Sequence, residues 1–202
     1  MRVITGRYKG RKLRGPVGLE IRPTGDRLKE SLFDILGDRV RDCVFLDVFA
    51  GTGAIGIEAL SRGAREALFI ENEGRCCRLI RQNLELCGAS GGRVMSKEAF
   101  SALRALARGE FRPDFVFLDP PYNFEPYADL LDILFGTGLA GADCLVIIEH
   151  SSRAPVPDSG ECFCRTRVVR QGDAALSFYR AGPQPPPEAG GTGRGAAGTD
   201  AG

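Results

Sequence analysis

Val44–Gly56 reads VFLDVFAGTGAIG, and the order of its residues sets the fold class. An apolar run, Val44–Val48, ends beside two close glycines, and apolar residues at helical spacing begin directly after them. Strand, tight turn and helix in this order open an α/β nucleotide-binding unit. Glycine at the turn lets backbone N–H groups approach a ligand that a Cβ would keep away. The first turn of the following helix presents further unpaired N–H groups there.

The glycine pattern alone is compatible with two nucleotide cofactors. Gly51-x-Gly53-x-x-Gly56 matches the dinucleotide fingerprint, and Glu71 follows at about the spacing of a ribose-binding acid. Asp47, at the carboxyl end of the strand, argues against NAD, because a carboxylate there would repel a pyrophosphate. It suits a ligand with positive charge, such as the amino and sulfonium groups of S-adenosylmethionine (SAM). Short glycine motifs also match by chance, so a purely structural turn is the third alternative.

The composition is that of one ordinary globular domain. The chain has 202 residues, of which 43% are hydrophobic and 26% charged, enough for a single core with a small extension. No apolar run reaches the length of a membrane span, and the N-terminus lacks the apolar core of a signal peptide, so we expect a cytoplasmic protein. One histidine and no C-x-x-C among seven cysteines predict reduced thiols and no metal site.

The charge is distributed unevenly along the chain. Residues 1–19 hold six basic residues and no acid; because the whole chain carries +1, the remainder sums to −5. Two short strands, Arg2–Thr5 and Tyr8–Leu13, are expected in this arm around Gly6, with Tyr8 as an aromatic among the basic residues. Such an arm on a mildly acidic body suggests a nucleic acid whose phosphates Lys and Arg would neutralise. The alternative is a solvated surface strand.

The remaining pattern alternates between helices and strands. Helices are expected over 25–36, 54–62, 75–86, 100–107 and 127–135. Strands are expected over 67–70, 93–95, 115–118, 144–149, 161–170 and 174–180, the last two joined by a hairpin turn. With Val44–Val48 they make a mostly parallel seven-stranded sheet with an antiparallel edge. Residues 181–202 are rich in Gly, Pro and Ala and predict a disordered tail.

A second motif, Asp119-Pro120-Pro121-Tyr122, follows the buried strand 115–118. Proline fixes φ and has no N–H donor, so the turn is stiff and its carbonyls stay available. The Asp119 carboxylate and the Pro120 carbonyl can then accept hydrogen bonds from the two N–H groups of a nucleobase amino group, with Tyr122 stacked on the base. The alternative is a rigid turn before a helix, without a chemical role.

Together these motifs resemble the RsmD family, the bacterial small-subunit rRNA guanine-N2 methyltransferases. The similarity runs from Arg2 to about Arg180 and rests on Gly10-Arg11-Lys12-Leu13, Arg22-Pro23-Thr24-x-Asp26-Arg27, the loop after Asp47, Glu71 and Asp119-Pro-Pro-Tyr. The resemblance implies a Rossmann-like SAM-dependent methyltransferase over 37–180, with an RNA-binding hairpin and helix over 1–36. It implies 16S rRNA or a small-subunit assembly intermediate as the partner, and we expect a monomer.

The resemblance also implies roles for individual residues. The reaction is assigned to Asp119, Pro120, Pro121 and Tyr122. Cofactor contacts are assigned to Asp47, Phe49, Gly51, Gly53, Glu71 and Glu98, the last at the adenine. RNA contacts are assigned to Arg7, Lys9, Arg11, Lys12, Arg14, Arg22 and Arg27. From the residues alone, an adenine-N6 or other amino-group methylase, an NAD-dependent oxidoreductase and a catalytically silent RNA-binding module remain as alternatives.

Overall fold

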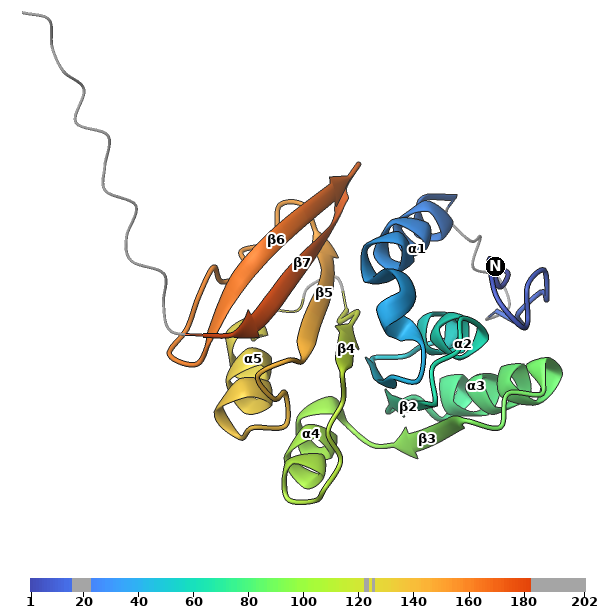
Figure 1. Cartoon of the computed structure of the whole chain (residues 1–202), viewed down its shortest axis with the longest axis horizontal. Coiled ribbons are helices and arrows are strands. Elements are labelled where there is room, and N and C mark those ends of the chain that lie inside the picture. The colour runs from blue at the N-terminus through green and yellow to red at the C-terminus, as the bar shows by residue number, and fades with distance from the viewer. Residues whose placement is uncertain (16–22, 122–123, 125, 183–202) are drawn as a thin grey trace, which may run out of the picture.

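The computed structural model describes residues 1–15, 23–121, 124 and 126–182, and of residues 23–26 the helical backbone alone. Its elements alternate along the chain as the sequence predicts (Figure 1). They are α1 (Pro23–Leu36), the 3₁₀ helix η1 (Gly37–Val40), β1 (Val44–Val48), α2 (Ala54–Ser61), β2 (Glu66–Glu71), α3 (Gly74–Cys87), β3 (Gly92–Ser96), α4 (Ala99–Ala107), β4 (Phe115–Leu118), α5 (Tyr127–Gly136), β5 (Leu145–Ser151), β6 (Phe163–Gln171) and β7 (Ala174–Ala181).

The described strands form one seven-stranded sheet in the order β3-β2-β1-β4-β5-β7-β6. The pairs among β3, β2, β1, β4 and β5 are parallel, whereas β7 is antiparallel to both of its neighbours. The mostly parallel sheet with an antiparallel edge is therefore confirmed, with β7 inserted between β5 and the outer strand β6. No helix in the described part of the chain combines the length and apolar character needed to cross a membrane.

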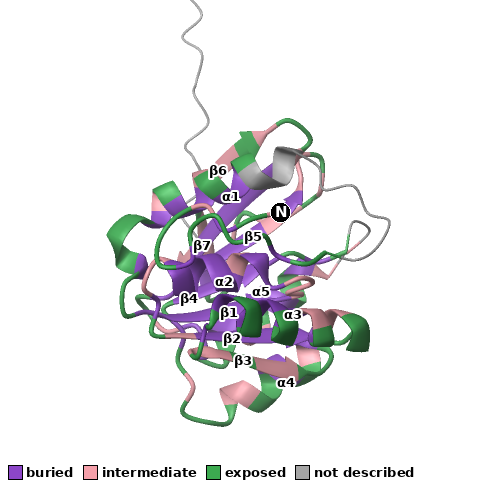
Figure 2. Ribbon diagram, turned by 90° about the vertical axis from the view of Figure 1, so that its right-hand side faces the viewer, coloured by how far each residue is buried: buried purple, intermediate pink, exposed green. Residues whose placement is uncertain are grey.

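Helices cover both faces of the sheet; its strands β1, β2 and β4 are almost entirely buried, whereas β3 and β6 are partly exposed (Figure 2). On one face α1, α2 and α3 pack on every second strand residue, including Phe45, Phe69 and Phe117. On the other face α4 and α5 pack on the alternate residues, including Leu46 and Val116. Side chains of a strand point alternately to opposite faces, so the near-continuous apolar runs of the central strands fill both cores.

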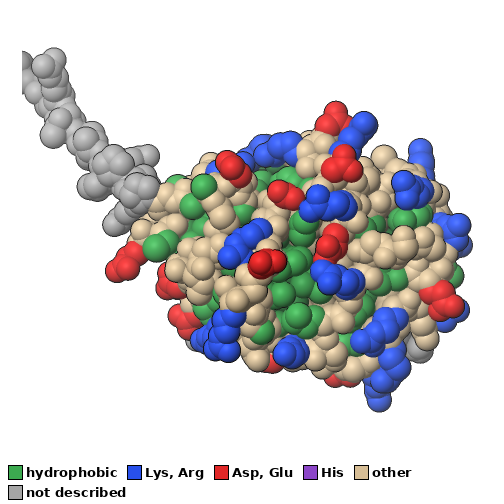
Figure 3. Space-filling model, turned by 60° about the horizontal axis from the view of Figure 1, so that its bottom comes forward, with side chains coloured by type: hydrophobic (Ala, Val, Ile, Leu, Met, Phe, Trp, Pro, Cys, Tyr) green, Lys and Arg blue, Asp and Glu red, His purple; other side chains and the backbone are tan. Residues whose placement is uncertain are grey.

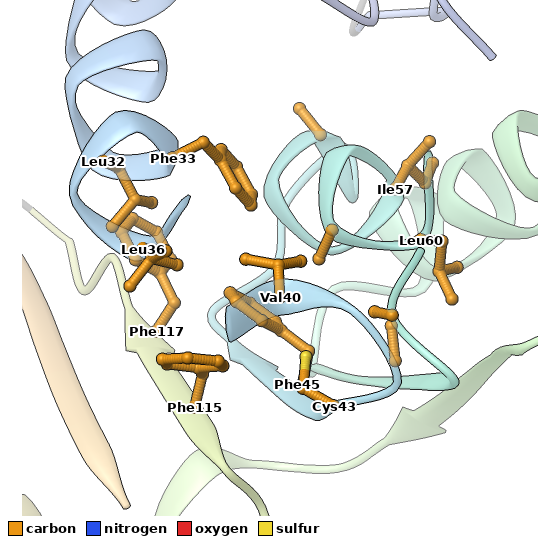
Figure 4. Packing of buried hydrophobic residues seen from close by; sticks show 14 of the residues in the cluster. Leu32, Phe33, Leu36, Val40, Cys43, Phe45, Ile57, Leu60, Phe115 and Phe117 are labelled. Atoms are coloured by element: carbon orange, nitrogen blue, oxygen red, sulfur yellow. The ribbon is translucent and has the colours of Figure 1, made fainter. Parts of the chain in front are cut away.

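Aromatic residues join α1 to the centre of the sheet (Figure 4). The ring of Phe33 on α1 stacks on Phe45 of β1 at a centroid distance of 6.3 Å, and Phe45 contacts Phe115 of β4 at 6.2 Å. The guanidinium of Arg62, on the chain just after α2, also lies over the Phe33 ring, 4.8 Å from its centroid. These contacts fix α1 directly above the β1–β4 pair.

The strand order reverses between β1 and β4, and a ligand-binding crevice is expected at this point. After β1 the chain moves outward to β2 and β3, then returns to β4 on the opposite side of β1. Ligands of open α/β sheets bind at the carboxyl ends of the strands where the order reverses in this way. The pairs Asp47↔Phe117 and Val48↔Leu118 place the ends of β1 and β4 side by side.

Several predicted boundaries are wrong. The two strands expected in the N-terminal arm are reduced to a single antiparallel bridge, Arg2↔Lys12, because Gly6 and Gly10 have positive φ and curl the chain instead. Helix α1 begins at Pro23, earlier than expected. Strand β5 continues to Ser151, so His150 lies within the strand. The predicted tail lies outside the described residues from position 183 onward.

Candidate active site

Asp47 of β1 supports the loop between β1 and α2 through a hydrogen bond. Its Oδ2 accepts a hydrogen bond from the Gly56 amide at 2.9 Å, and its residue is only 2% exposed. A Cβ on Gly56 would lie 2.3 Å from the Phe69 ring, so only glycine lets α2 pack this closely on β2. Asp47 thus fixes the start of α2 while its charge lies just beneath the loop.

The loop backbone adopts conformations that L side chains rarely take. Gly51 and Gly53 have φ of 54° and 77°, and Phe49, which is not a glycine, has φ of 61°. Strained residues of this kind concentrate at ligand-binding sites. A Cβ on Gly51 would meet nothing nearer than the Phe49 carbonyl at 4.0 Å, so this side of the loop is open for a ligand.

Glu71, at the end of β2, supports the same loop from the neighbouring strand. Its Oε2 accepts from the Gly51 amide at 2.8 Å and its Oε1 accepts from the Glu73 amide at 2.8 Å. Each carboxylate oxygen can accept a second hydrogen bond. The side chain can therefore hold the loop and still accept from the hydroxyls of a ribose, the role predicted for it.

Asp119 lies beside the loop, at the end of β4. Its amide donates to the Val48 carbonyl at 3.3 Å, which ties the turn after β4 to the end of β1. Pro120 is buried and Pro121 is exposed, and the Pro121 carbonyl accepts from the Phe124 amide at 2.9 Å, closing a tight turn. Tyr122, the predicted stacking residue, lies outside the described residues.

Four carboxylates end four neighbouring strands, in the sheet order Glu71, Asp47, Asp119 and Glu149. Each lies two positions after a strand residue whose side chain packs under α1–α3. Side chains alternate between the two faces along a strand, so all four acids lie on that same face. We call them the acidic row. The sequence analysis identified three of them and missed Glu149, which the pair Leu118↔Ile148 places next to Asp119. An acid ending an apolar run was the signal that could have found it.

Loss of hydration raises the pKa values of Asp47, Asp119 and Glu149. Burial raises the pKa of Asp47 well above its ordinary value, and the charges of Asp119 and Glu71 add to this. Asp119 is exposed on one side, yet the protein atoms around its carboxyl raise its pKa to about 6. Burial and the charge of Asp119 raise the pKa of Glu149 to about 8. No Lys or Arg of the described residues forms an ion pair with these groups. The row therefore fits a cationic ligand such as SAM.

An aromatic wall stands at the same end of the sheet as the row, on the face that α4 and α5 cover. Phe124 contacts Phe49 edge-on at 5.5 Å, stacks near Phe100 at 6.3 Å and meets Tyr127 edge-on at 5.3 Å. Of these residues only Phe49 was predicted to belong to the site. Flat apolar rings beside a strained loop provide surfaces on which a nucleoside can stack.

Glu98, predicted to contact adenine, caps α4. Its two carboxylate oxygens accept from the amides of Phe100 and Ser101, each at 2.9 Å. Capping accounts for an acid at this position. Contact with adenine stays a prediction.

His150 of β5 has hydrogen-bond partners on both ring nitrogens. Nδ1 lies 2.7 Å from the Ser151 carbonyl and Nε2 lies 2.8 Å from Ser177 Oγ. Burial lowers its pKa. These contacts fit a neutral histidine that holds β5 to β7.

The N-terminal arm packs tightly on α2 and α3. Val3, Tyr8 and Leu13 enter the core on this face, so Tyr8 is buried and not an exposed partner of the basic residues. Glu58, fully buried on α2, accepts from the amides of Ile4 at 2.8 Å and Thr5 at 3.0 Å.

The predicted RNA-binding side chains point outward from this docked arm. The exposed ones are Arg7, Lys9, Arg11, Lys12, Arg14 and, on α1, Arg27; Arg22 lies outside the described residues. Arg11 donates to the Leu86 carbonyl of α3, and Arg14 Nη1 donates to Gln82 Oε1 at 3.2 Å. The arm thus lies along the carboxyl-terminal half of α3.

Helix α3 extends the basic surface of the arm. It carries three exposed arginines that the sequence analysis did not consider, namely Arg75, Arg78 and Arg81. In Figure 3 mostly basic side chains follow the right-hand edge, the side on which α3 and the N-terminus lie in Figure 1, whereas acids and bases alternate over the middle. We call the exposed basic residues of the arm and of α3 the basic surface.

A hollow of about 690 Å³ lies at the amino end of the sheet, away from the acidic row. The arm, the end of α1 and the end of α2 surround it, and its lining mixes bases such as Arg41 with acids such as Asp38. Size alone does not make it the site, because the loop, the acidic row and the aromatic wall all lie at the other end.

Comparison with known proteins agrees with the geometry. A family described as Conserved hypothetical protein 95 matches residues 1–180. The Ribosomal RNA small subunit methyltransferase D of Escherichia coli K12 is 32% identical over 180 residues, 89% of this chain and 89% of its own length. The solved structure of Escherichia coli yhhF has a TM-score of 0.78 at 32% identity, covering 91% of this chain and 99% of that one.

A more distant structure shows the fold alone. SMU.776, solved in complex with SAH, has a TM-score of 0.64 at 15% identity and covers 79% of this chain and 50% of its own. The open loop, Glu71 and the rest of the acidic row suit a cofactor of this class. The chain belongs to the family of Ribosomal RNA small subunit methyltransferase D, and it is a Rossmann-like methyltransferase that uses SAM.

Proposed function

We propose that the protein methylates the exocyclic N2 amino group of a guanine in small-subunit (16S) rRNA. The observation that carries the proposal is the placement of Asp119 beside the cofactor loop, where its amide is bonded to the Val48 carbonyl. The name of the Escherichia coli relative supports an rRNA of the small subunit as the substrate. Because rRNA is made in the cytoplasm, we place the protein there, and we propose that it acts as a monomer on the RNA or on an assembly intermediate.

The chemistry requires a better nucleophile than an aromatic amine. The lone pair of guanine N2 is delocalised into the ring. Accepting hydrogen bonds from both N–H groups, through the Asp119 carboxylate and the Pro120 carbonyl, would turn the nitrogen toward tetrahedral geometry and direct its lone pair at the cofactor. SAM, when bound, supplies the methyl group. Positioning and electrostatics then account for most of the acceleration.

Asp119 can also take up the proton that the reaction releases. After transfer the nitrogen is cationic and acidic, and the raised pKa of Asp119, about 6, makes its carboxylate a suitable acceptor near neutral pH. No histidine base is required, which agrees with the contacts on both ring nitrogens of His150. The acidic row also favours a cationic cofactor electrostatically.

The target base must leave its stack to reach Asp119. Enzymes that modify a base extrude it, and they hold it between flat side chains. Phe124 and Phe49 offer such surfaces beside the loop. The basic surface would contact the flanking phosphates without reading sequence, so affinity should fall with salt.

The product identifies the function. We would isolate rRNA from cells that lack the gene and map methylated nucleosides by mass spectrometry, with the gene for the wild type or for Asp119→Ala restored. We expect one N2-methylguanine of 16S rRNA to disappear and to return only with the wild type. A missing N6-methyladenine would instead assign the alternative amino-group methylase.

The basic surface is tested by charge reversal. We expect Arg11→Glu/Lys12→Glu to weaken RNA binding about tenfold at low salt and to flatten its salt dependence, because two phosphate contacts are lost. Fluorescence anisotropy over a salt series measures both. Reversal of the exposed Arg108 and Arg112, which lie beyond α4 on the other face of the sheet, is the matched control. Equal effects at the two places would reject the assigned surface.

A further inference from the structure

One buried amide links the N-terminal arm to the cofactor loop. Asn83 of α3 has no exposed surface. Its Oδ1 accepts from the Arg14 amide at 2.8 Å, and its Nδ2 donates to the Arg14 carbonyl at 3.0 Å. The same Nδ2 donates to the Thr52 carbonyl at 3.0 Å. Asn83 therefore pairs with the arm on one side and with the loop residue between Gly51 and Gly53 on the other.

The two carboxylates beneath the loop do not bond this part of it. Asp47 bonds Gly56 and Glu71 bonds Gly51, both through amides. The carbonyl of Thr52 is bonded by Asn83, and the Thr52 hydroxyl lies 3.6 Å from Met1 Sδ of the arm. The tip of the loop is thus held by the arm and by the side chain on which the arm rests.

The arm has little freedom to change its position. Gly6 has φ of 87°, and a Cβ there would lie 1.9 Å from the Ser61 carbonyl oxygen. Ser61 Oγ accepts from the Tyr8 amide at 2.9 Å, and the Ser61 carbonyl accepts from the Arg7 amide at 2.7 Å. The arm is therefore seated on α2 through Ser61, and farther along the chain Arg14 is held by Asn83.

We propose that Asn83 is a positioning residue that makes the conformation of the cofactor loop depend on the seating of the arm. Binding of SAM and binding of RNA then strengthen each other. This effect on RNA binding rests on the proposed RNA-binding role of the arm. Coupling of this kind is reciprocal, so each ligand raises the affinity for the other by the same factor.

Asn83→Asp tests the link at unchanged side-chain size. It replaces the N–H donor with an acceptor that faces the carbonyls of Thr52 and Arg14. We expect the Kd for SAM, measured by calorimetry, to rise about tenfold and the KM for SAM to rise with it, while kcat at saturating SAM is retained. Gln82→Ala is the matched control, because Gln82 touches the Arg14 side chain and no loop residue; its SAM affinity should equal that of the wild type. An unchanged SAM affinity in Asn83→Asp overturns the proposal.

Gly6→Ala tests the dependence on the arm without altering Asn83 or the loop. The added Cβ must displace the arm from Ser61, so we expect weaker SAM binding, and the double variant with Asn83→Asp should bind SAM no more weakly than the weaker single variant. If Gly6→Ala retains full SAM affinity, or if the two effects add, the link through the arm is refuted. This measurement also serves if Asn83→Asp does not fold.

RNA affinity gives the reciprocal readout. With saturating S-adenosylhomocysteine, which prevents turnover, we expect the wild type to bind RNA about fivefold more tightly and Asn83→Asp to show no such gain. Equal gains in both proteins contradict the coupling. If reversal of Arg11 and Lys12 leaves RNA binding unchanged, the RNA-binding role itself fails, and the SAM results with Asn83 and Gly6 stand apart from it.

Discussion

Glu58 and the acidic row lie on the same side of the sheet but differ in their partners. Glu58 has no exposed surface and accepts from two arm amides and from Arg62 Nε at 2.9 Å. In the acidic row, Asp47, Asp119 and Glu149 have raised pKa values and form no ion pair within the described part of the chain. A buried acid with charged and amide partners holds elements together, whereas acids without an ion pair suit a cationic ligand, the role that we propose for the acidic row.

The largest expected effect belongs to Asp119, the acid that we propose accepts from the target amino group. Asp119→Ala should lower methylation by about 10³-fold, because the acceptor for the amino group is lost, while SAM binding is retained. Single-turnover methylation and calorimetry measure the two quantities. Asp129→Ala, at an exposed acid of α5, is the control and should act as the wild type. Normal turnover by Asp119→Ala would falsify the proposed mechanism.

Stability should distinguish Glu58 from the acidic row. Glu58→Ala leaves the amides of Ile4 and Thr5 and the Arg62 guanidinium without their acceptor, so we expect the free energy of unfolding to fall by about 3–5 kcal/mol. Urea unfolding measures it. The exposed Glu85 on the neighbouring helix is the control, and Glu85→Ala should change the value by less than about 0.5 kcal/mol. If Glu58→Ala and Glu85→Ala lower the free energy of unfolding by similar amounts, the hydrogen bonds and ion pair of Glu58 do not stabilise the fold.

The smallest expected effect is a gain in stability, in contrast to the loss expected for Glu58→Ala. The pKa of Glu149 rises from 4.5 to about 8 on folding, so the folded protein keeps a proton that the unfolded chain releases, and stability falls as pH rises through this range. Glu149→Gln has no such loss. We expect its Tm to match the wild type near pH 5 and to exceed it by about 3 °C at pH 8.5.

Thermal unfolding at both pH values checks this prediction. Glu161→Gln, at an exposed acid before β6, should show no pH-dependent difference. A Glu149→Gln protein less stable than the wild type at pH 8.5 would place Glu149 with Glu58 among the structural acids.

Local sequence patterns were sufficient to predict the strands and, at the ends of two of them, Asp47 and Asp119. Asp47 and Asp119 each end an apolar run and precede glycines or prolines, so their strands and positions were predictable. Glu149 also ends an apolar run, at the end of the expected strand 144–149, but no glycine or proline follows it directly, so it was not singled out. The number and mostly parallel character of the strands followed from the alternation of apolar segments.

Contacts between distant segments could not be predicted in this way. Glu58 and the amide of Ile4 are 54 residues apart, and Asn83 and Arg14 are 69 apart. Glu58 and Asn83 look like ordinary helix residues until the arm is placed on α2 and α3. Tyr8 was misjudged for the same reason, since its basic neighbours face solvent while its ring faces the core.

The reversal of strand order between β1 and β4 has a consequence for how activity arises during synthesis. Glu71 and Asp47 belong to the segment that ends with β3, whereas Asp119 and Glu149 belong to the later segment that begins with β4. Their mutual repulsion arises only when these two halves dock, so it opposes the last step of folding. A nascent chain that has reached only β3 contains Asp47 and Glu71 but not Asp119, so under the proposed mechanism methyl transfer requires the later half of the sheet.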